Sequence, residues 1–152
     1  MQAHPKATDR PSLRPEMTRA MTRATGLDEP QLVAVVHSFY AKVRRDPILG
    51  PIFETRIADW DAHLARMVTF WSSVALMTGH YHGSALTAHL GLPVQWGDFE
   101  RWLNLFRETA EEICSPEGAR HLIERAERIA LSLHTAVQQA KPDDAATFSA
   151  SV

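Results

Sequence analysis

Apolar residues that recur every three to four positions constrain the fold of this chain more than any other feature, because this spacing is typical of amphipathic helices. No segment shows the strict alternation of apolar and polar residues that is typical of a half-buried strand. The sequence therefore predicts an all-α fold. The recurring residues form five groups, Leu32/Val36/Phe39/Tyr40/Val43, His63/Met67/Phe70/Trp71/Val74, Leu86/His89/Leu90, Phe99/Trp102/Leu103/Phe106/Ala110/Ile113 and Leu122/Ala126/Ile129/Leu133/Val137.

Proline, glycine and capping residues predict where these helices begin and end. Asp46-Pro47 ends the first helix, because the residue before a proline avoids the α region. Gly50-Pro51 then marks a tight corner that carries Ile52 and Phe53. Residues that favour a helix N-terminus stand before four of the segments, namely Asp28, Asp59, Asp98 and Ser115.

The two ends of the chain differ from its middle. Residues 1–26 contain three prolines and two acidic residues, together with five basic residues, namely Lys6, Arg10, Arg14, Arg19 and Arg23. We expect residues 1–26 to be a mobile N-terminal extension with one helical turn, residues 27–139 to be the folded domain, and residues 140–152 to be a frayed C-terminal tail. A single cysteine, Cys114, excludes an internal disulfide and indicates a reducing, cytoplasmic location.

Charge and hydropathy narrow the classes of partner. The formal net charge is −2 and the body of the chain carries no basic stripe, which argues against a nucleic-acid partner. No run of 18 apolar residues occurs, so the sequence predicts no membrane insertion.

Polar side chains interrupt the apolar stripes at four positions. Tyr40 and Trp102 lie within stripes, where such residues usually bury the ring and give the O–H or N–H one partner. His89 stands near a predicted helix C-terminus and could complement the helix dipole there. His63 stands near a helix start, where a charged imidazole gains nothing from the dipole. The sequence leaves open whether these side chains fill the core or face a ligand.

Three histidines, His80, His82 and His89, lie close together in the sequence and raise the question of a metal. A zinc site needs four ligands, or three and a water, and neither a cysteine pair nor an HExxH motif supplies the rest. An iron held by a flat macrocycle fits better, because it commonly takes one histidine and leaves its other face to polar donors. Such a pocket needs apolar bulk, which is available from Phe53, Met67, Phe70, Trp71, Phe99 and Phe106.

The order and spacing of five short motifs resemble the truncated haemoglobins, and most closely the third group of that family. The resemblance covers residues 30–137 and implies a two-over-two helical sandwich around haem. The motifs are FY (39–40), DPILGPIF (46–53), WxxHxxxMxxFW (60–71), YxGxxxxxHxxLP (81–93) and FxxWLxLF (99–106).

The resemblance implies a role for each matching residue. His89 would be the proximal iron ligand, and His80 and His82 would be bystanders near the haem edge. The distal, ligand-binding residues would be Tyr40, His63 and Trp102. Residues in contact with haem would be Phe53, Arg66, Met67, Phe70, Trp71, Tyr81 and Phe99, of which Arg66 and Tyr81 would reach a propionate.

The implied function is reversible binding of O₂, CO or NO, as in oxygen transport, at the iron of haem b. The chain has no CxxCH motif for covalent haem attachment. A peroxidase or NO dioxygenase is the enzymatic alternative. No acid lies between Tyr81 and Gly97 to hold the proximal histidine, which favours ligand binding over peroxidase chemistry. A small helical interaction domain without haem is the third alternative. The reductase partner, and whether the protein is a monomer or a dimer, stay open.

Overall fold

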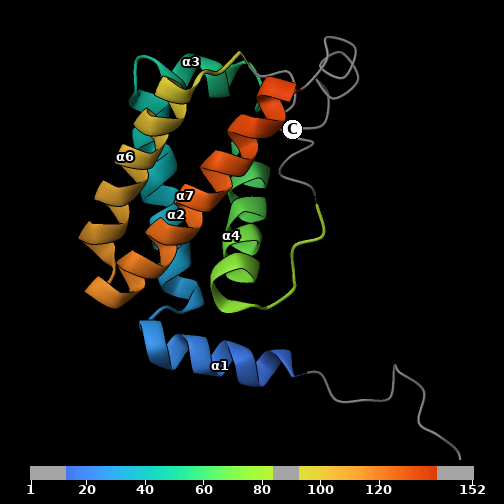
Figure 1. Ribbon diagram of the computed structural model, residues 1–152, viewed down its shortest axis with the longest axis vertical. Coiled ribbons are helices and arrows are strands. Elements are labelled where there is room, and N and C mark those ends of the chain that lie inside the picture. Colours follow the sequence, from blue (N-terminus) through green and yellow to red (C-terminus); the bar gives the residue numbers. More distant parts are fainter. Residues whose placement is uncertain (1–12, 84–92, 140–152) are drawn as a thin grey trace, which may run out of the picture.

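The computed structural model describes residues 13–83 and 93–139, and these residues form helices and no strand (Figure 1). The all-α prediction is therefore confirmed. The short helix predicted around Leu86 and Leu90 lies outside the described residues, as do residues 1–12 and 140–152. In the described part of the chain, no helix is both long and apolar enough to cross a membrane. The helices are α1 (Arg14–Thr25), α2 (Glu29–Arg45), α3 (Leu49–Glu54), α4 (Trp60–Leu76), α6 (Trp96–Ile113) and α7 (Pro116–Gln139).

Four long helices make two layers, as the two-over-two arrangement requires. Helix α2 packs on α4, helix α6 packs on α7, and α6 also packs on α2 (Figure 1). Aromatic rings fill the space between the layers. Phe106 on α6 stacks on Trp71 of α4 with ring centroids 4.9 Å apart, and its edge meets Phe39 of α2 at 5.3 Å. Trp102 stacks on Phe106 at 5.7 Å, so the core also fixes the orientation of the Trp102 indole.

The turn from α2 to α3 is fixed by one carboxylate. Asp46 accepts hydrogen bonds from the backbone N–H groups of Ile48 and Leu49 and from Nε of Arg101 on α6. The Arg101 hydrogen bond is the main reason why the pKa of Asp46 lies below its ordinary value. These bonds join the end of α2 and the start of α3 to α6, and therefore hold together three helices that carry candidate site residues.

Two details of the predicted helix boundaries are wrong. The expected corner at Gly50-Pro51 is itself the short helix α3, in whose first turn a proline is tolerated. Gly50 is required there, because a Cβ would lie 2.8 Å from the Arg44 carbonyl oxygen. Asp98 is not the N-cap of α6, which begins earlier, with Gln95 as N-cap; the Asp98 carboxylate accepts the Gln95 backbone N–H and completes a capping box.

Helix α1 (Arg14–Thr25) is longer than the one helical turn expected in residues 1–26. It runs for twelve residues across one end of the molecule and packs on α4 and α7 (Figure 1). The Thr18 hydroxyl donates to the Leu76 carbonyl oxygen at 2.6 Å, and the Thr25 carbonyl oxygen accepts from the Ser115 hydroxyl at 3.1 Å. Met21 of α1 also packs against the core, but α1 is mostly polar and its sequence therefore did not reveal it as the other helices were revealed.

Candidate functional site

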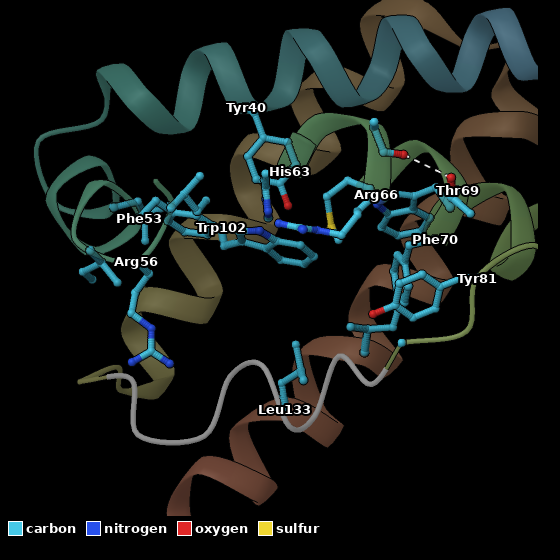
Figure 2. Close-up of a pocket in the computed structure, with 18 of the residues that line it drawn as sticks. Tyr40, Phe53, Arg56, His63, Arg66, Thr69, Phe70, Tyr81, Trp102 and Leu133 are labelled. Atoms are coloured by element: carbon cyan, nitrogen blue, oxygen red, sulfur yellow. Dashed lines mark hydrogen bonds between the residues drawn. The ribbon is translucent and has the colours of Figure 1, made fainter. Parts of the chain in front are cut away.

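A cavity of about 550 Å³ opens between the two helical layers (Figure 2). Its volume falls within the ~300–1,000 Å³ that is usual for small-molecule sites. The candidate residues that the structure describes all line it, although they come from α2, α3, α4, α6 and the segment after α4. These are Tyr40, Phe53, His63, Arg66, Met67, Phe70, Trp71, Tyr81, Phe99 and Trp102. His89 lies outside the described residues.

Tyr40, His63 and Trp102, which we call the donor cluster, converge on one part of the cavity (Figure 2). Tyr40 comes from α2 and His63 from the first turn of α4, and their side chains are only 5% and 7% exposed. The edge of one ring meets the face of the other with centroids 5.0 Å apart. Three groups able to donate a hydrogen bond are thus held in a mostly apolar cavity.

The local sequence explains how the donor cluster is positioned. The Asp59 side chain accepts the Ala62 backbone N–H and starts α4 at Trp60, which places His63 one turn into the helix. Tyr40 is held between the layers by an edge contact with Phe39 at 4.9 Å. Burial raises the pKa of the Tyr40 phenol, because the buried phenolate would lose its hydration. At neutral pH Tyr40 is therefore a hydrogen-bond donor.

Four further lining residues, which we call the exposed edge, are the solvent-exposed Arg66, His80 and His82 and the half-buried Tyr81. Figure 2 shows the Arg66 side chain reaching from α4 into the cavity. The Tyr81 ring meets Phe70 edge-on at 5.2 Å, and its backbone N–H donates to the Ser73 hydroxyl. His80 and His82 line the cavity but are exposed to solvent, as expected for bystander residues.

Several lining residues were not among the candidates. Ile129 and Leu133 belong to the predicted stripe of α7, but spacing alone does not distinguish a residue that faces a cavity from one that packs in the core. Arg56 follows α3 and carries a second guanidinium to the lining. In the sequence, Arg56 is a basic residue three positions after Phe53, and no pattern predicted that it lines the cavity.

The lining suits a large, flat and mainly apolar group that carries anionic substituents. Aromatic and aliphatic side chains make up most of the surface, and arginines at positions 56 and 66 supply positive charge. Across residues 13–83 and 93–139, no three histidine, cysteine, aspartate or glutamate side chains lie close enough to hold a bare metal ion. The zinc alternative through His80, His82 and His89 involves a residue beyond these ranges.

Comparisons with known proteins agree with the sequence motifs. No family model matches the chain. The chain is 35% identical over 109 residues to the group 3 truncated hemoglobin ctb of Campylobacter jejuni. This match covers 68% of this chain and 86% of that protein. Among solved structures, the crystal structure of a group III truncated hemoglobin from Campylobacter jejuni matches with a TM-score of 0.70 and 32% identity, covering 74% of this chain and 93% of that chain.

Proposed function

Because the chain belongs to the group III truncated haemoglobins, which are haem-binding globins, we propose that it holds haem b in this cavity and binds O₂, CO or NO there reversibly. The observation that carries the proposal is the convergence of Tyr40, His63 and Trp102 in a mainly apolar cavity. Membership of a globin family favours this function over a helical interaction domain without haem.

The residues of the cavity suit haem in both polarity and charge. The faces of a porphyrin need apolar neighbours, and Phe53, Phe70 and Trp71 are available from two sides. Its propionates need cations or hydroxyls near solvent, which Arg66 and Tyr81 offer at the exposed edge.

On the basis of the family motif, we assign His89 as the single protein ligand of the iron. When bound, haem supplies an iron with an open coordination position for a diatomic gas. The ring nitrogen of His89 that does not bind iron would carry the proton and donate it in a hydrogen bond to an acceptor. This hydrogen bond would fix the tautomer in which the other nitrogen can bind the iron.

The donor cluster would stabilise a small ligand that accepts hydrogen bonds. The Tyr40 O–H and the Trp102 N–H can each donate a hydrogen bond, and neutral His63 can donate from whichever ring nitrogen carries the proton. Each neutral hydrogen bond contributes about 1 kcal/mol, so two of them slow the release of O₂ by roughly one to two orders of magnitude. Such slow release favours tight holding of the ligand over bulk delivery.

The three neighbouring histidines give the assignment of His89 a matched test. Hemin is titrated into the apoproteins of the variants His89→Ala, His80→Ala and His82→Ala, and the Soret band and its shift with CO after reduction are recorded. We expect His89→Ala alone to lose the wild-type ferrous and CO spectra. Wild-type spectra from His89→Ala, or their loss in His80→Ala or His82→Ala, would contradict the assignment.

A further inference from the structure

Trp60 touches two members of the donor cluster without lining the cavity. It is the first residue of α4, and its ring lies 5.7 Å from the His63 ring, edge to face, and 6.1 Å from the Tyr40 ring. Because Trp60 is not among the cavity-lining residues, it contacts the two donors from behind. Trp60 and His63 are three residues apart on one helix, which is the spacing at which side chains meet.

Arg44 also packs on the Trp60 ring. Its guanidinium carbon lies 4.4 Å from the ring centroid, and its Nε donates to Glu54 Oε1 at 3.2 Å. Arg44 stands on α2, Glu54 on α3 and Trp60 on α4, so this contact joins the three helices at the surface. Trp60 therefore contacts both a cation and the Tyr40–His63 pair.

Ring packing, and not a hydrogen bond, sets the orientation of Trp60. Its indole Nε1 is buried and has no hydrogen-bond partner among the described residues. An indole forms the strongest of the common cation–π pairs, so Arg44 adds to the ring contacts that orient Trp60.

These ring contacts favour the inward orientation of His63. An imidazole is polar and would gain hydration by turning outward from an apolar cavity. His63 stands in the first turn of its helix, close to the surface, yet its side chain is buried. The rings of Tyr40 and Trp60 pack against it and oppose outward rotation.

We propose that Trp60 is a positioning residue that keeps the His63 imidazole inside the cavity, and that the Arg44–Glu54 pair controls how often His63 turns outward. This inference rests on the proposed function, in which His63 faces the gas ligand. In this inference the contact of the Arg44–Glu54 pair with Trp60, at the surface and away from the ligand, sets the rate at which the ligand enters and leaves.

The accessibility of His63 gives a readout that does not require haem. The full-length protein is treated with diethyl pyrocarbonate, which acylates accessible imidazoles, and the rate at His63 is followed by mass spectrometry of its peptide. We expect Trp60→Leu to raise this rate about tenfold, because two ring contacts are lost. Trp60→Phe should give an intermediate rate.

Arg44 provides a milder test at the surface. Arg44→Gln should raise the acylation rate of His63 about two- to fivefold, and Arg44→Lys, which keeps the cation, should largely restore the wild-type rate. Arg107→Gln is the matched control: Arg107 pairs with Glu127 at 3.1 Å, with side-chain exposures of 39% and 48%, close to the 46% and 49% of the Arg44–Glu54 pair. In the haem-loaded protein, CO association should accelerate in the same order.

Either of two results would overturn the inference: an unchanged rate at His63 in both Trp60→Leu and Arg44→Gln, or an equal rise in Arg107→Gln. If Trp60→Leu does not fold, as judged by circular dichroism, the Arg44 variants decide alone. A protein that takes up no hemin would refute the proposed function instead, and the two failures are therefore distinguishable.

Discussion

The donor cluster and the exposed edge face the same cavity but are built differently. Tyr40 and His63 are buried, stand on capped helices and pack against other rings. At the exposed edge, Arg66 is a long side chain near solvent, and His80 and His82 belong to a non-helical segment. The buried groups are held in one orientation by the core, whereas the exposed groups act mainly through charge. We therefore expect the donor cluster to set ligand affinity and the exposed edge to set cofactor retention.

The largest effect is expected from removing hydrogen-bond donors of the donor cluster, and it concerns the rate of O₂ release. The double variant Tyr40→Phe/Trp102→Phe removes two buried donors and should speed the release of O₂ by about ten- to a hundredfold. Each single variant should give part of this increase. Release is measured by stopped-flow mixing of the oxygenated protein with excess CO.

Tyr81→Phe is the matched control, because it also removes a tyrosine hydroxyl, but from the exposed edge. The release of O₂ should not change in this variant. If Tyr81→Phe speeds release as much as Tyr40→Phe does, the distinction between the two regions is wrong.

The same contrast explains what the sequence predicted well. Helices α2, α4, α6 and α7 carry long apolar stripes and clear caps, and these also place Tyr40, His63 and Trp102 on inward faces. Helical spacing predicted that these residues face inward, whereas their meeting around a ligand was implied by the resemblance to the truncated haemoglobins and not by the spacing.

The features that the sequence did not reveal depend on tertiary contacts. Helix α1 is mostly polar and is held by contacts with distant residues, such as the hydrogen bond from Thr18 to Leu76 and the packing of Met21 on the core. Arg56 lines the cavity only because α3 is a helix that directs the chain there, and Trp60 gains its place from Arg44 on another helix. Such contacts between distant residues leave no periodic pattern in the chain.

A second prediction sharpens the difference in burial between the two tyrosines of the chain, Tyr40 and Tyr81. The phenol of an unfolded tyrosine titrates near pH ~10, and burial raises the pKa of Tyr40 above this value. Above that pH the unfolded chain releases a proton that the folded protein keeps. The free energy of unfolding should therefore fall as the pH rises, by up to about 1.4 kcal/mol per pH unit for this group.

Urea denaturation at pH 8 and pH 11 checks this effect. Tyr40→Phe should lose less stability between the two pH values than the wild type does. An identical loss in the wild type and in Tyr40→Phe would show that the phenol of Tyr40 is not protected by burial.

The smallest expected effect concerns the exposed edge. Arg66→Gln removes a solvent-screened partner for a propionate and should speed hemin loss about two- to fivefold, with a smaller difference at high salt. Arg66→Lys keeps the charge and should lie close to the wild type. Hemin loss is followed by transfer to an excess of a haem-scavenging protein. A large change in the release of O₂ by Arg66→Gln would contradict the assigned division of roles.

The visible absorption spectrum of the purified protein, recorded oxidised, reduced and with CO, tests the central claim most directly. The account predicts a Soret band that shifts on reduction and shifts again with CO. A protein that shows no Soret band, even after hemin has been added, would contradict it.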